Sequence, residues 1–97
     1  MAVLDLSFDG DIFEWRGPSP FYYVAIPEDE SGDIQEIANE VTYGWGCIPV
    51  NVTLGKTRWY TALFPKDGVY LVPVKAAIRK AEKVDEGDTV TLRVEVG

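Results

Sequence analysis

The stretch VYLVPVKAAIRKAEKVDEGDTVTLRVEV, residues 69–96, is the part of the chain that defines the fold most clearly. Its apolar start, Tyr70-Leu71-Val72, predicts a strand, and Pro73 stands where the first position of a helix tolerates proline. The next residues carry an apolar stripe at helical spacing, namely Val74, Ala77, Ile78 and Ala81. After Gly87, apolar and polar residues alternate, which is typical of a half-buried strand. The stretch therefore predicts a strand, a short helix and a second strand.

The first half of the chain repeats this order. Tyr23-Val24-Ala25-Ile26-Pro27 matches the first strand with its proline, and Gly46 precedes a second alternating segment at 48–54. The helical stripe between them is Ile34, Ile37, Ala38 and Val41, and Asp33 with Glu36 predicts a capping box at its start. The prolines of the two units are 46 residues apart. We expect both stripes to point inward, because two facing strand–helix–strand units can close one small barrel without exposed strand edges.

The remaining segments add further strands. Apolar residues occupy even positions over 4–12, which predicts a half-buried strand with Gly10 as a candidate bulge. Residues 47–64 alternate on both sides of a tight glycine turn and predict a β-hairpin. We therefore expect a single barrel domain over residues 1–97. Its predicted class is mainly β (α+β), with about six strands and two short helices.

Charge is distributed unevenly along the sequence. The chain holds 16 acidic and 9 basic residues, which gives a net charge of −7. Residues 1–40 contain ten of the acids and a single base, Arg16, whereas residues 56–83 carry seven bases and two acids. Because nucleic acid and anionic membranes repel an acidic protein at long range, we expect neither as a partner. The basic segment either binds an anion or neutralises the acidic half within the fold.

Other residue types restrict the chemistry. The chain has no histidine, the commonest metal ligand and general base. Cys47 is the only cysteine and has no histidine to activate it, so we interpret it as structural. The acidic clusters Asp9-Gly10-Asp11 and Glu28-Asp29-Glu30 lack the spacing of a calcium loop and are interpreted as surface charge. We expect no metal, no cofactor and, without a long apolar segment or a signal-like start, a cytoplasmic protein.

Several motifs resemble one family. They are Phe13-Glu14-Trp15-Arg16-Gly17 followed by Phe21-Tyr22-Tyr23-Val24, then Gly44-Trp45-Gly46-Cys47-Ile48-Pro49-Val50, Leu63-Phe64-Pro65, residues 70–81 and Gly87-Asp88-Thr89-Val90. In this order and spacing they resemble the small prokaryotic family DUF1905, a domain of unknown function, from about Phe8 to Val96. The resemblance implies a double-split β-barrel. It implies no established activity and therefore no catalytic residue.

A second resemblance covers residues 69–96 only. The strand, Pro73, the helix with Arg79 and the turn Glu86-Gly87-Asp88 look like the swapped hairpin of AbrB-type regulators and MazE-type antitoxins. Those proteins close a barrel from two short chains, whereas both halves lie in one chain here. We therefore expect one chain to close its own barrel and to exist as a monomer or a weak dimer.

The aromatic residues are the most unusual feature for a chain of this length. Together with the nearby basic residues they give the candidate ligand-binding set Arg16, Trp15, Trp45, Trp59, Lys75 and Arg79. Tryptophan beside arginine is typical of a recognition surface, while the alternative is that the rings fill a small barrel. Lys75, Arg79 and Lys83 are four residues apart and predict one basic stripe, which either holds an anion or faces solvent.

These observations favour a non-catalytic binding module for a small anionic ligand or a protein partner. The alternative is an AbrB-like nucleic-acid-binding or antitoxin-type regulator, which needs a continuous exposed basic surface. A small enzyme is the class least favoured, because no pair of a nucleophile and a base is visible in the sequence.

Overall fold

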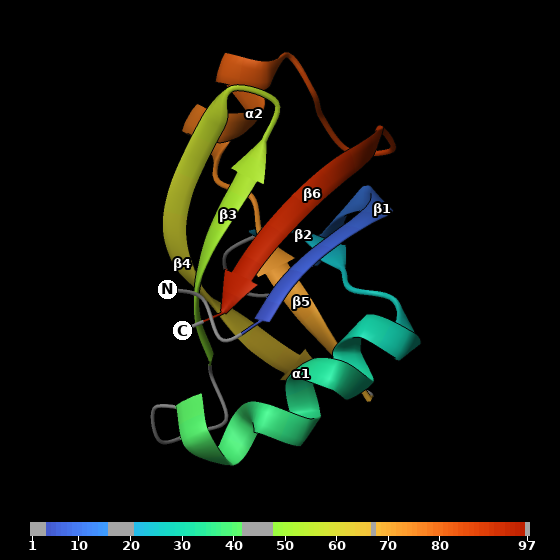
Figure 1. Cartoon of the computed structure of the whole chain (residues 1–97). Helices are drawn as coiled ribbons and strands as arrows, with labels where there is room; N and C mark the ends of the chain where they lie inside the picture. The colour runs from blue at the N-terminus through green and yellow to red at the C-terminus, as the bar shows by residue number, and fades with distance from the viewer. Residues whose placement is uncertain (1–3, 16–20, 42–47, 67, 97) are drawn as a thin grey trace.

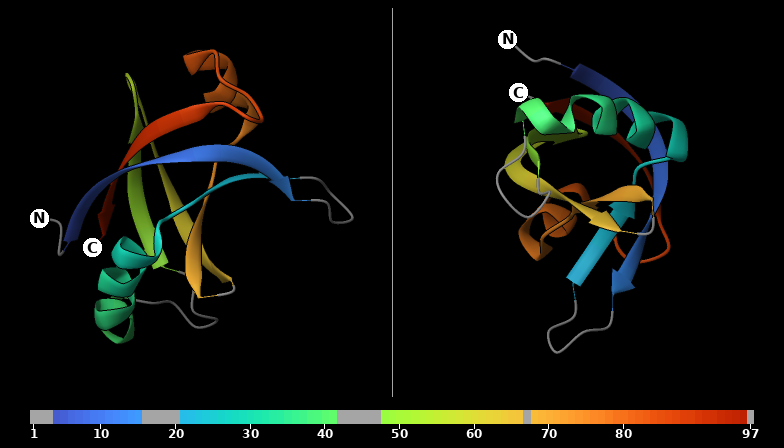
Figure 2. Two further views of the ribbon diagram at one scale, coloured as in Figure 1. Left: turned by 90° about the vertical axis from the view of Figure 1, so that its right-hand side faces the viewer. Right: turned by 90° about the horizontal axis from the view of Figure 1, so that it is seen from below.

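The computed structural model describes residues 4–15, 21–41, 48–66 and 68–96, with only the backbone described for 38–41. The elements of this part are β1 (Leu4–Trp15), β2 (Phe21–Ala25), α1 (Glu28–Val41), β3 (Ile48–Leu54), β4 (Thr57–Lys66), β5 (Val69–Pro73), α2 (Ala76–Glu82) and β6 (Thr89–Val96). The strands close into an antiparallel barrel in the order β1-β2-β5-β4-β3-β6. Figures 1 and 2 show α1 at one end of the barrel and α2 at the other. The predicted mainly β barrel with two short helices is confirmed.

Alternation of side chains along the strands explains why the barrel closes around one core. Every second residue of β3 and β6 is buried, namely Ile48, Val50, Val52 and Leu54 on β3 and Val90, Leu92, Val94 and Val96 on β6. Phe8 and Ile12 of β1 join the same core. Since a shift of one residue would turn a whole inward set toward solvent, this alternation also fixes the strand register.

Strand β1 is long enough to serve both halves of the barrel. It pairs with β6 over Leu4–Asp11 and with β2 over Ile12–Trp15. Its register against β6 runs through Gly10 without an extra residue, so the predicted bulge is wrong. A Cβ atom at Gly10 would lie 2.6 Å from Cγ1 of Val24 on β2. Glycine is therefore required by the close approach of β2 where β1 changes its partner.

Strands β3 and β4 form the predicted hairpin. Leu54 pairs with Thr57 and leaves Gly55-Lys56 as a two-residue loop. Gly55 has a φ of 58°, which glycine adopts without strain at the first position of such a turn. The hydroxyl of Thr57 also donates to Oε2 of Glu82 at 2.6 Å, so the end of α2 is tied to this hairpin.

Helix α1 begins earlier than the sequence analysis predicted. The carbonyl of Pro27 accepts a helical hydrogen bond from the Ser31 N–H at 2.8 Å. The acidic residues Glu28–Glu30 therefore form the first turn rather than a preceding loop, and the helix dipole favours carboxylates there. Asp33 and Glu36 lie inside the helix, so the predicted capping box is wrong.

A buried hydroxyl fixes α1 on the barrel. Ser31 is 1% exposed, and its Oγ donates to the carbonyl of Ile26 at 2.9 Å. The same oxygen accepts from the N–H of Tyr70 at 3.1 Å, so one side chain links α1 to the end of β2 and to β5. Ile34 is fully buried and Ile37 packs against the core, as predicted.

Helix α2 begins later than predicted and is only seven residues long. Pro73 is the last residue of β5, Lys75 is the N-cap and Ala76 starts the helix, so the proline is not its first residue. Val74 is buried but precedes the helix, and Ile78 is the buried residue of α2. Of the other predicted stripe positions, Ala77 and Ala81 are exposed, whereas the side chains of Ala38 and Val41 lie outside the described residues. One buried side chain suffices because α2 only covers the end of the barrel.

The two halves are related by a local two-fold axis. Exchanging β1 with β4, β2 with β5 and β3 with β6 reproduces the strand order of the barrel. Where β2 meets β5, the Ile26 N–H donates to the Tyr70 carbonyl and the Val74 N–H donates to the Tyr22 carbonyl, both at 2.9 Å. These bonds make Tyr22 equivalent to Tyr70, which is an offset of 48 residues. The prolines, at an offset of 46, are therefore not equivalent positions.

Candidate binding site

The outer surface of the barrel has a polar half and an apolar half. Where β1 pairs with β6, its outward residues are Asp5, Ser7, Asp9 and Asp11. Where β1 pairs with β2, its outward residues are Phe13 and Trp15. On β4, the outward residues are Arg58, Tyr60 and Ala62 beside β3 and Phe64 beside β5. Outward positions of a barrel in water are normally polar, so the apolar half needs an explanation.

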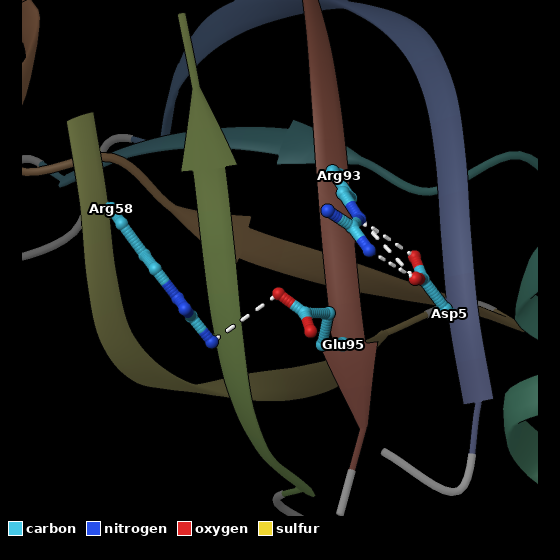
Figure 3. Close-up of polar contacts among 4 residues, drawn as sticks. All are labelled: Asp5, Arg58, Arg93 and Glu95. Atoms are coloured by element: carbon cyan, nitrogen blue, oxygen red, sulfur yellow. Dashed lines mark hydrogen bonds and ion pairs between the residues drawn. The ribbon is translucent and has the colours of Figure 1, made fainter. Parts of the chain in front are cut away.

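The polar half pairs its own charges, as Figure 3 shows. Arg93 of β6 donates to Asp5 of β1 from Nη2 at 2.6 Å and from Nε at 3.0 Å. These hydrogen bonds lower the pKa of the Asp5 carboxyl and raise the pKa of Arg93. Arg58 of β4 reaches across β3, and its Nη2 lies 3.3 Å from Oε1 of Glu95 on β6 (Figure 3). The charges of this half are therefore already matched to one another.

The acidic residues of β1 are also satisfied locally. Asp9 accepts a hydrogen bond from the Thr91 hydroxyl at 2.6 Å, and Asp11 accepts one from the Thr89 hydroxyl. Both carboxylates are exposed, which agrees with their interpretation as surface charge. Within the described ranges, no three cysteine or carboxylate side chains gather in an arrangement that could hold a metal ion.

The apolar half carries a cluster of rings that we call the aromatic face, formed by Phe13, Trp15, Phe21, Tyr23 and Phe64. Tyr23 lies at its centre, with ring centroids 5.9 Å from Trp15, 6.2 Å from Phe13 and 6.4 Å from both Phe21 and Phe64. Trp15, Phe21 and Phe64 remain 39%, 57% and 44% exposed. Tyr23 is buried beneath them, and this burial raises the pKa of its phenol.

The strand register defines this face. Phe13 pairs with Tyr23, and Leu71 pairs with both Ala25 and Phe64. Paired residues point to the same side of a sheet, so Leu71 also lies on the outside of the barrel. Tyr23 and Leu71 are both buried, yet neither belongs to the interior core. The aromatic face is therefore a second apolar cluster, built on the outer surface.

Lys66 gives the aromatic face a positive charge. Its Nζ lies 3.3 Å from the centroid of the Trp15 ring, which is a cation–π contact. Lys66 forms no ion pair with any other described residue. The predicted site residue Trp15 thus lies on an exposed surface of the kind used for recognition. Its neighbour Arg16 lies outside the described residues.

A groove adjoins the aromatic face at Phe21. It has a volume of about 220 Å³ and is lined by Phe21, Tyr22, Pro73, Val74, Lys75, Ala76 and Arg79. We call it the Arg79 groove. It brings together two of the predicted site residues, Lys75 and Arg79. Phe21 belongs to both surfaces, so the groove and the aromatic face are continuous.

Three contacts hold the Arg79 guanidinium in place. Its Cζ lies 3.7 Å from the centroid of the Tyr22 ring, and Nη1 donates to the Val74 carbonyl at 2.8 Å. Nε is 3.7 Å from Oδ1 of Asp85, whose side chain is 77% exposed. The Arg79 side chain itself is only 16% exposed. Nη2 makes no hydrogen bond to a described residue.

Tyr22, whose ring contacts the Arg79 guanidinium, is itself held by a hydrogen bond. Its hydroxyl donates to Oε2 of Glu14 at 3.0 Å, and this hydrogen bond raises the pKa of the Tyr22 phenol. The hydrogen bond to Glu14 helps to hold the Tyr22 ring beside the Arg79 guanidinium. Lys75 is exposed at the rim and makes no ion pair within the described part of the chain.

The other predicted site residues lie elsewhere. Trp59 points inward from β4 and packs against the core, and its Nε1 is buried without a hydrogen-bond partner among the described residues. Trp45 and Cys47 lie outside the described residues. The predicted basic stripe is wrong: Lys83 is the left-handed C-cap of α2, with a φ of 56°, and Arg79 is turned onto Tyr22. A seven-residue helix is too short to carry a row over three turns.

The predicted site lacks five residues of this surface, namely Phe13, Phe21, Tyr23, Phe64 and Lys66. A signal was present, because Phe13 and Trp15 occupy the odd, outward positions of a strand whose earlier odd positions are polar. This pattern in β1 does not reveal how the other strands pair, and that pairing brings the further rings to the same face.

Comparison with known proteins agrees with the motifs. The family described as Domain of unknown function (DUF1905) matches residues 8–94. The chain belongs to this family. The resemblance drawn from the sequence is thus confirmed, whereas a comparison with curated proteins gives no significant match. The closed six-stranded barrel described above is the architecture of this DUF1905 domain. Neither of its described helices has the length and apolar character needed to cross a membrane.

Proposed function

We propose that this domain is a non-catalytic binding module whose aromatic face receives an apolar segment of a partner protein. The observation that carries the proposal is the change from polar to aromatic outward residues along β1, to which β2 and β4 add the exposed rings of Phe21 and Phe64. The barrel is already closed around its own core, so Trp15, Phe21 and Phe64 are not needed to fill it. Exposed patches of this composition mark protein interfaces, where tryptophan, tyrosine and phenylalanine are enriched.

Charge on and around the face defines the chemistry of the partner. Lys66 lies on the face, and Lys75 stands at its edge beside Phe21. The outward residues that surround the rings are Ala25, Val69, Leu71, Pro73 and Lys66, with no carboxylate among them. The partner segment therefore carries a carboxylate next to its apolar side chains. At physiological ionic strength charges act over about 8 Å, so these lysines act on a bound segment more strongly than the carboxylates where β1 pairs with β6.

A second copy of this chain is a poorer match for the face. Each chain carries a net charge of −7, so two copies repel each other as they approach. A nucleic acid is also disfavoured. Of the described cations, Arg58, Arg79 and Arg93 each lie beside a carboxylate. The net charge of −7 also repels a polyanion at long range, so an AbrB-like regulator is the less favoured interpretation.

The test uses a random-sequence peptide library displayed on phage, selected against the intact protein. Enriched peptides are expected to combine aliphatic or aromatic residues with at least one carboxylate. The tightest peptide is then measured by titration calorimetry against Phe64→Ser and the matched control Tyr60→Ser. Tyr60 is an exposed aromatic residue of the same strand, but it lies beside β3, away from the face.

We expect Phe64→Ser to weaken binding at least tenfold, as loss of an aromatic anchor does, and Tyr60→Ser to change it little. Equal binding by both variants, or no enrichment of peptides, would overturn the proposal. Analytical ultracentrifugation of the free protein tests whether a second copy of the chain covers the aromatic face instead. A dimer that Phe64→Ser dissociates would mean that a second copy covers the face, contrary to the partner proposed here.

A further inference from the structure

We infer that the Arg79 groove binds a carboxylate attached to a small apolar group, such as an aryl carboxylate. The inference rests on the groove, which shares Phe21 with the aromatic face and Lys75 with its edge. Its test uses small probes and variants other than Phe64→Ser, so it can fail independently of the proposed docking of a partner segment.

The first reason is that Arg79 is fixed before any ligand arrives. Tyr22 stacks against its guanidinium and the Val74 carbonyl holds Nη1, so the side chain loses little freedom on binding. The two N–H groups of Nη2 have no partner among the described residues. A guanidinium is planar and binds carboxylates through paired, charge-assisted hydrogen bonds, which are shorter and stronger than neutral ones.

The second reason is the charge around the groove. Its lining residues include two cations, Lys75 and Arg79, and no carboxylate. The nearest acidic groups are otherwise engaged: Glu14 accepts from the Tyr22 hydroxyl, and Asp85 accepts the backbone N–H of Glu86 at 2.8 Å. Asp85 is also largely in solvent and 3.7 Å from Nε, so it competes weakly for Arg79. The groove therefore holds positive charge that the protein does not fully neutralise.

The third reason is the apolar lining. Phe21, Pro73, Val74 and Ala76 supply hydrophobic walls beside the two cations. A volume of about 220 Å³ is below the roughly 300–1,000 Å³ of sites for drug-sized ligands. The ligand is therefore small, with one ring or a short branched chain joined to its carboxylate. A bare inorganic anion would leave the apolar walls without a partner.

Two sources could supply such a group. One is a free aryl or alkyl monocarboxylic acid, and the other is the terminal carboxylate of a polypeptide that ends in an apolar residue. Both present the same chemistry to Arg79 and Lys75. Benzoate represents the free acid, and N-acetyl-phenylalanine represents the chain terminus.

The experiment follows the backbone amides of Phe21, Tyr22 and Ala76 by NMR during titration of the intact protein. The probes are benzoate, its neutral counterpart benzamide, N-acetyl-phenylalanine and inorganic phosphate. Lys75→Gln tests the exposed cation without disturbing a described contact, and Lys80→Gln is the matched control. Lys80 is an exposed residue of α2 that does not line this groove. Arg79→Gln is measured alongside them.

We expect benzoate to shift these amides and benzamide to bind at least tenfold more weakly. Lys75→Gln should weaken the binding of benzoate about threefold, and Arg79→Gln should weaken it at least tenfold. Lys80→Gln should leave the binding of benzoate unchanged. Added salt should also weaken it, because Lys75 is exposed. Tighter binding of N-acetyl-phenylalanine than of benzoate would identify the chain terminus as the source, and the reverse order would identify a free acid. Equal binding of benzamide, equal effects of the two lysine variants, or phosphate binding as tightly as benzoate would overturn the inference.

Discussion

Replacing Ser31 by alanine removes the hydroxyl that links α1 to two strands. The Tyr70 N–H and the Ile26 carbonyl lose a partner in a site where Ser31 is 1% exposed. A buried donor left without a partner costs about 1–3 kcal/mol. Alanine favours the helix over serine by about 0.5 kcal/mol, which offsets part of that cost. The expected net loss in the free energy of unfolding is therefore about 0.5–2.5 kcal/mol.

The neighbouring residue provides a matched control. Gly32 lies in the same helix, is exposed, and a Cβ atom there would meet nothing within 4 Å. Gly32→Ala should therefore stabilise the protein by up to about 1 kcal/mol through helix propensity alone. Two adjacent substitutions to alanine are thus expected to change stability in opposite directions, because only Ser31 faces the barrel.

Thermal unfolding followed by circular dichroism is the assay, since about 1 kcal/mol shifts Tm by roughly 4–8 °C in a domain of this size. Hydrogen exchange adds a local measurement, because the Tyr70 amide should exchange faster in Ser31→Ala and stay protected in Gly32→Ala. If both variants shift Tm in the same direction, or if Tyr70 exchange is unchanged in Ser31→Ala, the role assigned to the hydroxyl is refuted.

Two further predictions concern the barrel itself. Gly10→Ala is expected to destabilise by about 1–3 kcal/mol, because its Cβ atom would overlap Val24. Adding Val24→Ala should recover part of that loss, so strictly additive urea-unfolding energies would contradict the contact. Asp5→Asn should lower Tm at neutral pH. Because Arg93 lowers the pKa of Asp5, its contribution is present above about pH 4 and is lost as pH falls through the lowered pKa. The difference in Tm between Asp5→Asn and wild type should therefore disappear in acid. The control is Asp33→Asn, a change at an exposed carboxylate. An equal, pH-independent loss of Tm in Asp33→Asn would contradict the role given to the Asp5–Arg93 pair.

The strands could be predicted from the sequence because one physical requirement determines them. A closed barrel has a single interior, so each strand must alternate, and the alternation over β3 and β6 is visible in the residues themselves. The helix boundaries were harder to predict from the sequence. Ser31-Gly32 has the composition of a loop, yet it lies inside α1 because the serine hydroxyl is satisfied by two strands that are distant in sequence.

The candidate site was only partly predictable for a related reason. Trp15, Lys75 and Arg79 were selected from their residue types, but the aromatic face depends on strand register. Phe64 reaches it because β4 pairs with β5, and β5 pairs with β2. Likewise, the spacing of the basic residues predicted a stripe, whereas Arg79 bends back onto Tyr22, a contact between different elements that spacing cannot reveal.

The local two-fold axis gives the aromatic face its composition. The axis passes between β2 and β5, the two central strands of the face. Phe13 pairs with Tyr23 on one side of the axis, and Phe64 pairs with Leu71 on the other, so Phe13 and Phe64 are equivalent. The outward positions are therefore apolar in both halves of the chain, although the interior core does not require it. Apolar outward residues thus recur at equivalent positions of the two halves and are not confined to one ring.

Among these equivalent outward positions, only one pair matches an apolar residue with a charged one. Trp15 pairs with Phe21, and its equivalent, Lys66, pairs with Val69. An indole on one side of the axis is thus matched by an ammonium on the other, and the two meet in the cation–π contact of 3.3 Å. A partner with a carboxylate at one end of an apolar segment can satisfy Lys66 in only one of the two orientations that the backbone symmetry would allow. For the partner proposed above, the orientation would therefore depend on this pair, while the surrounding rings would supply the contact area.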